Sequence, residues 1–224
     1  LHLLSRRQRQ MCIRDRTYTQ DESYYILDCK DDGGVYLGLK EGIDKNQMLT
    51  DLKCAQEGRV SFDAEKYVNK FHAKKHDHFL IPAGTIHCSS KTCMVLEISA
   101  TPYIFTFKLW DWDRLVLDGL PRPILIEDGE KNIQWNRTTS WVKDNLVNHV
   151  EMIHDGDDYL EERTGLHELE FIETRRFTSN HQTDHGFNML NLVEGQTALV
   201  ESPKNEFEPY TCLLYTSDAA DDLI

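Results

Sequence analysis

The stretch HFLIPAGTIH, from His78 to His87, decides the fold that this sequence predicts. Phe79 to Ile81 form a short apolar run of β type, and Pro82 ends it. Gly84 permits backbone conformations closed to other residues, so the chain can turn sharply before His87 begins the next apolar run. We therefore expect a strand, a tight turn and a second strand. This turn would aim the His87 imidazole into the mouth of a β-barrel, where it could serve as a metal ligand.

Both ends of the chain resemble translated sequencing adapter rather than native protein. Back-translation of RRQRQMCIRDR, Arg6–Arg16, gives one frame of a transposase adapter used to tag DNA libraries. CLLYTSDAADD, Cys212–Asp222, gives the same adapter on the opposite strand. We therefore expect residues 1–16 and 212–224 to be adapter-derived and exclude them from the fold prediction. Residues 17–211 would then be a fragment of the native protein. The alternative is a native basic N-terminal arm that binds nucleic acid.

The chain carries a strong negative charge. It has 25 Lys and Arg against 38 Asp and Glu, a formal net charge of −13 at pH 7. The end segments hold five of the basic and four of the acidic residues, so residues 17–211 carry about −14. This balance disfavours nucleic acid and anionic membrane surfaces as partners. No apolar run approaches the roughly 18 residues that a membrane span needs. We expect a cytoplasmic protein.

The cysteines outside the end segments show no metal-binding or disulfide pattern. They are Cys29, Cys54, Cys88 and Cys93, and no two of them form a CxxC pair. We therefore predict free thiols in a reducing compartment.

Strand and helix patterns alternate in the first half of the chain. Ser23–Leu39 predicts a hairpin, with two β-rich runs around the turn Asp31-Asp32-Gly33-Gly34. Lys45–Gln56 and Asp63–Ala73 are charged and have apolar residues spaced for one helical face. Further strands are predicted at Phe79–Ile81, Cys93–Ser99 and Tyr103–Leu109.

The second half begins with a Pro- and Gly-rich segment, DGLPRP at Asp118–Pro123, which is typical of a linker. Residues 118–164 are predicted to be linker and partly helical. Strand patterns resume at Glu168, in ELEFIETRRF, FNMLNLVEG and TALVES. We expect residues 165–211 to form a second β module, truncated because adapter sequence follows its last strand at once.

The pattern P-x-G-x-x-H at Pro82–His87 resembles the second conserved motif of the cupin superfamily. Cupins are small β-barrels that hold a metal between His and Glu side chains. The superfamily usually has a glycine six residues before the proline, and His76 stands there in this chain. The departure lies in a loop and leaves His87 in place. The alternative for His87 is a structural role, in which its imidazole makes its hydrogen bonds within the core and binds no metal.

Three segments together resemble a narrower family, the class I, zinc-dependent mannose-6-phosphate isomerases. They are DESYYIL at Asp21–Leu27, IPAGTIH at Ile81–His87, and LEISATPYIFTFKLWDWDR at Leu96–Arg114. The resemblance covers essentially all of residues 17–211. It implies that Glu22 and His87 are zinc ligands, and zinc accepts such mixed carboxylate and imidazole ligands. The family's other ligands, a Gln-x-His pair, would come from a strand before Glu22 that adapter replaces. A solvent-facing carboxylate is the alternative for Glu22.

The resemblance also implies a fold and a domain order. The fold would be mainly β: a cupin, or double-stranded β-helix (jelly-roll) barrel. Residues 17–117 would be a partial catalytic barrel with a helical insert at 45–73. Residues 118–164 would follow as the linker and partly helical segment, and residues 165–211 as a truncated second cupin-like module.

Three further residues are candidates for catalysis or substrate binding. Glu97 lies in the apolar run CMVLEIS, where burying an acid is costly unless it is paired or used. The family places a proposed proton-transfer carboxylate at this position; a structural role is equally open. Lys108 stands where many relatives have a catalytic arginine, and lysine lacks the bidentate fork of arginine. Arg114 would contact the substrate phosphate, or would pair with Asp111 or Asp113.

The resemblance implies an isomerase that interconverts mannose 6-phosphate and fructose 6-phosphate through an enediol, with a phosphorylated hexose as partner and zinc as cofactor. The fragment is expected to be inactive, since part of its site is missing. One alternative is a metal-dependent cupin oxygenase. Another is a non-catalytic sugar-binding or regulatory cupin. The oligomeric state is open.

Overall fold

The computed structural model describes residues 20–99, 106–117, 119–165, 172–183 and 188–214. The expected adapter segment 1–16 and residues 215–224 lie outside this range, as do residues 103–105 of the expected strand Tyr103–Leu109 and residues 168–171 of the strand expected from Glu168. The chain divides into two compact units, residues 1–180 and residues 181–224. Each unit is described by itself below.

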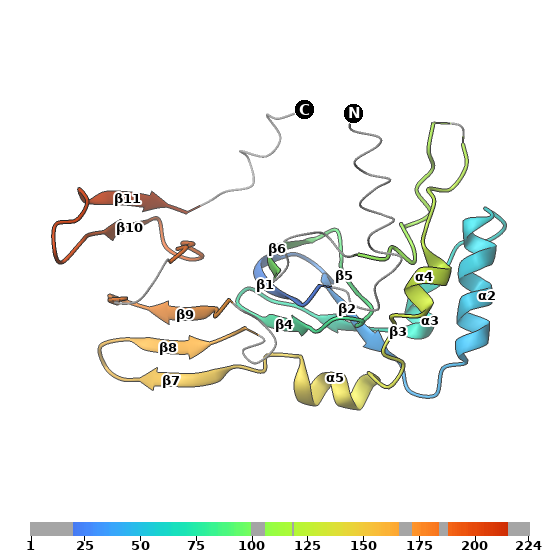
Figure 1. Cartoon of the computed structure of the whole chain (residues 1–224), viewed down its shortest axis with the longest axis horizontal. Coiled ribbons are helices and arrows are strands. Elements are labelled where there is room, and N and C mark those ends of the chain that lie inside the picture. Colours follow the sequence, from blue (N-terminus) through green and yellow to red (C-terminus); the bar gives the residue numbers. More distant parts are fainter. Residues whose placement is uncertain (1–19, 100–105, 118, 166–171, 184–187, 215–224) are drawn as a thin grey trace. The chain divides into compact units, whose positions relative to one another are not determined.

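The first unit contains two three-stranded antiparallel sheets (Figure 1). One has the order β4-β1-β6 and the other the order β3-β2-β5. The strands are β1 (Glu22–Cys29), β2 (Gly34–Leu39), β3 (Val68–His72), β4 (His78–Ile81), β5 (His87–Ser89) and β6 (Cys93–Ser99). The prediction of a mainly β fold is confirmed, and the tight turn after β4 leads into a strand that begins at His87, as predicted.

A hydrophobic core joins residues of the two sheets. It contains Tyr24 and Ile26 from β1, Val35 and Leu37 from β2, and Phe79, Leu80 and Ile81 from β4. In β1 and β2 these core residues are two positions apart, as the alternation of side chains along a strand requires. Burial of apolar surface between the sheets stabilises this unit by roughly 25 cal/mol per Å² removed from water.

The expected hairpin at Ser23–Leu39 is wrong. β1 and β2 do follow one another around a turn, in which Gly33 N donates to the Lys30 carbonyl at 3.0 Å. However, β1 pairs with β4 and β6, whereas β2 pairs with β3 and β5. The turn therefore carries the chain from one sheet to the other. Both strands bury apolar side chains, and each gains partners on both edges in this arrangement.

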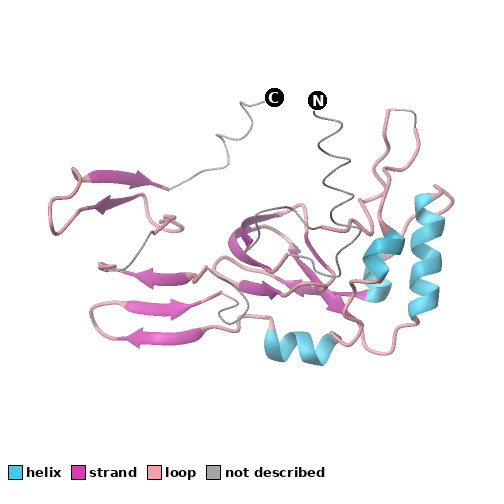
Figure 2. Ribbon diagram, in the orientation of Figure 1, coloured by secondary structure: helices cyan, strands magenta, loops and turns pink. Residues whose placement is uncertain are grey.

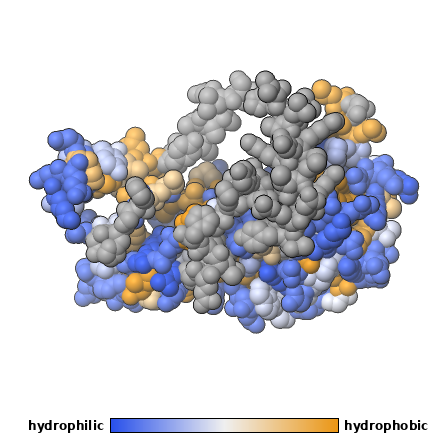
Figure 3. Space-filling model, viewed as in Figure 1, coloured by the Kyte–Doolittle hydropathy of each residue, from blue (hydrophilic) through white to orange (hydrophobic). Residues whose placement is uncertain are grey.

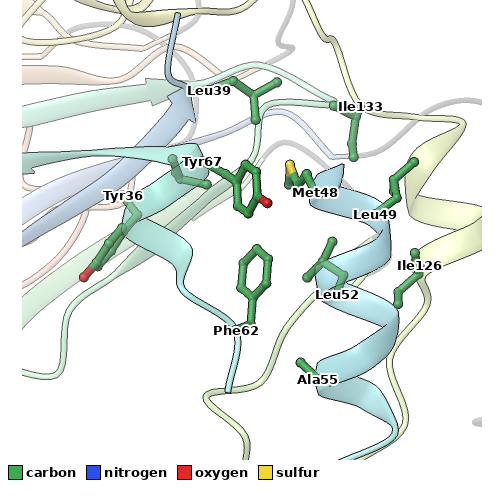
Figure 4. Packing of buried hydrophobic residues seen from close by; sticks show 11 residues of the cluster. Tyr36, Leu39, Met48, Leu49, Leu52, Ala55, Phe62, Tyr67, Ile126 and Ile133 are labelled. Atoms are coloured by element: carbon green, nitrogen blue, oxygen red, sulfur yellow. The ribbon is translucent and has the colours of Figure 1, made fainter. Parts of the chain in front are cut away.

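The helical insert predicted at 45–73 is correct only in its first part. α2 (Lys45–Gln56) begins at Asp44, whose side chain accepts hydrogen bonds from the backbone N–H groups of Asn46 and Gln47. Its buried face consists of Met48, Leu49, Leu52 and Ala55, as the spacing predicted. Figure 4 shows this face turned toward Phe62 and Tyr67, and Tyr36 belongs to the same cluster.

The second predicted helix, Asp63–Ala73, is a single turn followed by a strand. α3 (Ala64–Tyr67) ends where β3 begins at Val68. β3 pairs with β2, with Val68 opposite Leu39 and Phe71 opposite Val35. The helical spacing of the apolar residues was misleading because pairing with a distant strand outweighs a weak local pattern. The expected strand at Tyr103–Leu109 is also loop in its described part, residues 106–109.

The remainder of the first unit contains two short helices and a third sheet (Figure 2). The helices are α4 (Ile126–Glu130) and α5 (Thr139–Asn145). The third sheet has the antiparallel order β7-β8-β9, formed by β7 (Glu151–Asp155), β8 (Leu160–Arg163) and β9 (Arg175–Thr178). The expected module boundary at 164/165 falls between β8 and β9. The domain boundaries otherwise stay predictions.

The second unit contains one antiparallel pair, β10 (Thr197–Val200) and β11 (Tyr210–Leu213). None of its described residues is buried, and Leu199, Tyr210 and Leu213 are each more than half exposed. Figure 3 shows hydrophobic atoms (orange) among hydrophilic ones at the surface of this unit. β11 includes two residues of the segment expected to be adapter. An isolated pair of strands is at best marginally stable.

A disulfide joins Cys29 at the end of β1 to Cys93 at the start of β6. The two residues lie directly opposite one another in the sheet, with 4.1 Å between their Cα atoms. The prediction of free thiols is therefore wrong for this pair, because strand pairing brings together residues that are 64 positions apart in the sequence. Cys54 and Cys88 are free thiols, as predicted. In the described part of the chain, no helix has the length and apolar character to cross a membrane.

Candidate functional site

Glu22 and His87 form a pair that joins the two main sheets, in which Glu22 is buried and His87 is partly buried. Glu22 is the first residue of β1 and His87 the first of β5. His87 Nε2 lies 2.5 Å from Glu22 Oε1, and the Glu22 side chain is only 3% exposed. Burying a carboxylate is costly unless a partner compensates for the lost water. The solvent-facing alternative for Glu22 is therefore wrong. The two candidate ligands, which come from different segments of the sequence, are therefore in direct contact.

The pKa values of the pair shift in opposite directions. Burial raises the pKa of Glu22, but the hydrogen bond and charge of His87, together with hydrogen bonds from Gln20 and Glu97, leave that pKa lowered. Burial lowers the pKa of His87, but the hydrogen bond and charge of Glu22, together with the Thr85 carbonyl and the charge of Glu97, leave it raised. Without a metal, the pair is thus held as carboxylate and imidazolium.

The turn between β4 and β5 sets the orientation of the His87 ring. His87 Nδ1 donates to the Thr85 carbonyl at 2.8 Å, which leaves Nε2 facing Glu22. This is the arrangement of a typical metal-binding histidine, in which the second ring nitrogen is held by a backbone carbonyl. Gly84 has φ +82°, and a Cβ there would lie 2.3 Å from the Asn132 carbonyl oxygen. Only glycine fits this turn.

A small polar network surrounds Glu22. Gln20 Nε2 donates to Glu22 Oε2 at 2.5 Å, and Ser99 Oγ lies 3.4 Å from the same oxygen. Ser99 Oγ also donates to Glu97 Oε1 at 2.8 Å. The expectation that Glu97 is buried within its apolar run is wrong, because its side chain is exposed. Partial desolvation, and then the charge of Glu22, still raise the pKa of Glu97 despite the opposing hydrogen bond from Ser99. The sequence interpretation missed Gln20 and assigned no role to Ser99. The available signal for Ser99 was its spacing, two residues after Glu97 on the same face of β6. Gln20 precedes β1 and had no such signal.

A cavity of about 350 Å³ opens beside the pair. Its lining includes Glu22, His87 and Lys108, together with aromatic side chains such as Tyr36, Phe62 and Trp110. Tyr36 and Phe62 belong to the hydrophobic cluster of Figure 4, so the core itself forms part of the cavity wall. A pocket with mostly apolar walls and a few convergent polar groups is the usual form of a small-molecule site.

Lys108 is held by a buried carboxylate. Its Nζ lies 3.2 Å from Asp111 Oδ1, and Arg122 Nη1 lies 3.0 Å from Asp111 Oδ2. Two other predicted residues do not line the cavity. Glu97 is joined to the site through Ser99, and Arg114 is exposed, with its backbone N–H donating to the Asp111 carbonyl. The structure therefore brings Glu22, His87 and Lys108 together and leaves Arg114 outside their cavity.

The pair fits part of a zinc site. Glu22 supplies a carboxylate oxygen and His87 an imidazole nitrogen, both of which zinc accepts. The Gln20 side chain also offers an amide oxygen as a metal ligand, since its amide group lies against Glu22. Within the described ranges, no group of three or more His, Cys, Asp or Glu side chains is arranged to hold a metal ion. A complete site therefore needs additional ligands.

Comparison with known proteins gives relatives that share one enzyme name. The chain is 25% identical over 208 residues to "Putative mannose-6-phosphate isomerase YvyI" of Bacillus subtilis, covering 88% of this chain and 56% of that protein. It is 27% identical over 183 residues to mannose-6-phosphate isomerase ManA of the same organism, covering 80% and 52%. The chain is similar to bacterial mannose-6-phosphate isomerases. No family model matches it.

A solved structure supports the fold. The crystal structure of the mannose 6-phosphate isomerase from Bacillus subtilis matches with a TM-score of 0.55 at 19% identity, covering 87% of this chain and 56% of that one. At this identity the match concerns the fold alone. The chain spans about half the length of the curated relatives it matches. These relatives support a similarity to mannose-6-phosphate isomerases, while the narrower class I, zinc-dependent group stays a prediction.

Proposed function

We propose that the whole protein interconverts mannose 6-phosphate and fructose 6-phosphate, and that its metal centre lies in a cupin-type barrel formed by the two main sheets. The observation that carries this proposal is the contact of the buried Glu22 with the partly buried His87 at the wall of a cavity that Lys108 also lines. The names of the similar bacterial proteins support the choice of reaction.

In this proposal Glu22 and His87 hold zinc. Bound zinc would act as a Lewis acid toward the sugar oxygens. The contact between His87 Nδ1 and the Thr85 carbonyl keeps Nε2 available as the ligand atom. The apolar walls limit the access of water to the reacting carbons and so strengthen the electrostatic interactions of the charged groups.

Glu97 is the proposed group that moves the proton between the two adjacent sugar carbons. Its support is its motif and its connection to Glu22 through Ser99, since its side chain is exposed and outside the cavity lining. Lys108 is proposed to stabilise a negatively charged oxygen of the substrate with its ammonium group. Unlike arginine, it acts as a point charge. Arg114 remains the proposed phosphate contact, supported only by its motif, since its side chain is exposed and outside the cavity lining.

The test is metal analysis and an isomerase assay with mannose 6-phosphate, on the whole protein and its Lys108→Met variant. We expect zinc in both, and a fall in turnover of about 100-fold or more in the variant. Lys131→Met removes an exposed lysine that pairs with Asp128 and is the matched control. Unchanged turnover in Lys108→Met would refute the role of Lys108. Zinc without turnover in the unmodified protein would favour a non-catalytic sugar-binding cupin, and iron in place of zinc a cupin oxygenase.

The cytoplasmic location stays a prediction. The disulfide between Cys29 and Cys93 weighs against it, because disulfides persist mainly in oxidising compartments. Thiol titration of the denatured protein, purified with and without a thiol-blocking agent, would show whether the two cysteines are joined in the cell.

A further inference from the structure

Arg137, in the segment expected to be a linker, lies against the turn that presents His87. Its Nη1 is 2.7 Å from the carbonyl oxygen of Pro82 and 2.7 Å from that of Ala83. The same nitrogen donates to Thr85 Oγ1. One guanidinium nitrogen thus contacts three residues of a single turn. Hydrogen bonds from a charged donor are roughly twice as strong as neutral ones.

Arg137 is itself held in place. Its guanidinium lies over the Trp141 ring, 5.4 Å from the centroid. Its backbone carbonyl accepts from Leu39 N at 3.0 Å, which ties it to β2, and its backbone N–H donates to the Gln134 carbonyl at 3.1 Å. The side chain that contacts the turn is therefore anchored to the sheet that contains β5.

The residues just before Arg137 cover the same turn. Gln134 N donates to the Gly84 carbonyl at 3.0 Å, and the Asn132 carbonyl occupies the space that a side chain at position 84 would need. On the other side, Ala83 N donates to Asp21 Oδ1 at 2.7 Å. Asp21 is the neighbour of Glu22 in the chain. One turn is thus connected to both candidate ligands, to His87 through Thr85 and to Glu22 through Asp21.

We propose that Arg137 is a positioning residue for the metal centre, which fixes the Pro82–Thr85 turn and through it the direction of His87 Nε2. This inference rests on the proposed metal site. The orientation of the His87 ring depends on its hydrogen bond to the Thr85 carbonyl. The position of that carbonyl depends in turn on the conformation of the Pro82–Thr85 turn. Loss of an outer partner of a metal ligand typically costs 10–100-fold in metal affinity.

The experiment compares Arg137→Met with Arg176→Met in the whole protein, which would carry the additional ligands. Arg176 is a matched control because it also donates to a backbone carbonyl, that of His76 at 2.9 Å, and also lies over an aromatic ring, that of Tyr25 at 5.7 Å. Zinc affinity is measured by competition with a chromophoric chelator, and the geometry at the metal by the visible absorption of bound cobalt(II). Urea unfolding records the stability of each variant.

We expect both variants to unfold at lower urea, but only Arg137→Met to lose roughly 10–100-fold in zinc affinity and to change the cobalt spectrum. Equal losses of affinity in the two variants, or none in either, would overturn the proposal. Should Arg137→Met fail to fold, Arg137→Lys retains a charge at this position. A severalfold loss of affinity is then expected, and unchanged affinity with an unchanged cobalt spectrum would overturn the proposal.

Hydrogen exchange in the metal-free chain separates this inference from the metal site. If the unmodified whole protein binds neither zinc nor cobalt, the proposed metal centre fails on its own. Faster exchange of the Ala83, Thr85 and Gln134 amides in Arg137→Met than in Arg176→Met would still support the positioning of the turn. Equal exchange in the two variants would overturn it.

Discussion

Among the described residues of the first unit, glutamate side chains are buried in two places and have different partners there. On β1, Glu22 faces the imidazole of His87. On β8, Glu161 and Glu162 are 5% and 7% exposed and face the guanidinium groups of Arg175 and Arg176 on β9. Arginine stays charged at any physiological pH, whereas histidine can lose its proton and bind a metal. The chemical nature of the partner therefore distinguishes these pairs more clearly than burial does.

Access to a cavity is the second difference. Glu22 and His87 line the cavity that Lys108 shares, whereas neither Glu161 nor Glu162 contributes to its lining. The contacts on β8 and β9 are typical of structural ion pairs, with Arg175 Nη1 2.7 Å from Glu161 Oε1 and Arg176 Nε 2.6 Å from Glu162 Oε2. The comparison suggests that the β1 pair serves binding and the β8 pairs serve stability.

The largest effect is expected from His87→Ala. Removing the imidazole should lower zinc affinity by at least about 100-fold, since even loss of an outer partner costs roughly 10–100-fold. Metal competition titration measures the change, with Arg176→Met as the control that should keep its affinity. Equal affinity in His87→Ala and the unmodified chain would show that the β1 pair is structural like those on β8.

The next largest effect is expected from Glu162→Gln. This change leaves the Arg176 charge without its carboxylate and should lower the free energy of unfolding by about 2–4 kcal/mol. The figure is below that of a fully buried pair because 24% of the Arg176 side chain is exposed. Urea unfolding gives the value, and zinc affinity should not change. A loss of zinc affinity without a loss of stability would reverse the roles assigned to the two places.

A smaller effect is expected from pH in the metal-free chain. The pKa of Glu22 is lowered from its ordinary value of 4.5, so its contribution is present above that value and is lost as pH falls through the folded pKa. The pKa of His87 is raised from 6.5, so its contribution is present below that value and is lost as pH rises through the folded pKa. The pair therefore contributes most between about pH 4.5 and 6.5.

Urea unfolding at several pH values tests this window. The unmodified chain should exceed Glu22→Gln in stability by about 1–2 kcal/mol near pH 5.5, and by less above pH 8. The Glu162→Gln difference should show no such decline as pH rises, because arginine does not lose its proton there. A constant difference for Glu22→Gln across the whole range would contradict the assigned ion pair.

The smallest effect is expected from His154→Ala. His154 Nε2 lies 3.0 Å from Asp158 Oδ1, but the two side chains are 39% and 70% exposed. Water and salt screen such a pair, so removing it should leave the urea midpoint within error. A measurable loss would indicate that contact alone, rather than burial, gives a His–carboxylate pair its strength.

Much of the fold followed from local patterns. The buried face of α2 agrees with the spacing of Met48, Leu49, Leu52 and Ala55, and the turn after β4 agrees with its Pro and Gly. The errors arose where distant strands decide the outcome. The run at Val68–His72 forms a strand because β2 is available beside it, and the two runs of the expected hairpin pair with other strands.

The candidate site shows the same division. Glu22, His87 and Lys108 were identified from motifs, because each belongs to a short segment with a distinctive order of residues. Gln20, Ser99 and Arg137 belong to no such motif that the sequence interpretation used. Their importance comes from contacts that the structure shows. Gln20 contacts Glu22, two positions away, and Ser99 contacts the same residue from 77 positions away. Arg137 contacts the turn 52 to 55 positions before it.

The sequence by itself determined a mainly β protein, a glycine turn before His87, and a pair of candidate ligands in Glu22 and His87. The first two features depend on the conformational freedom of glycine, the missing N–H of proline and the apolar pattern of single strands, all of which are local properties. The candidate ligands come from the resemblance of three sequence segments to mannose-6-phosphate isomerases. Only the tertiary structure decided that the two ligands touch, that a disulfide joins Cys29 and Cys93, and that Arg137 supports the turn. These contacts depend on which strands and loops pack together, and packing is decided by the whole chain rather than by neighbours in sequence.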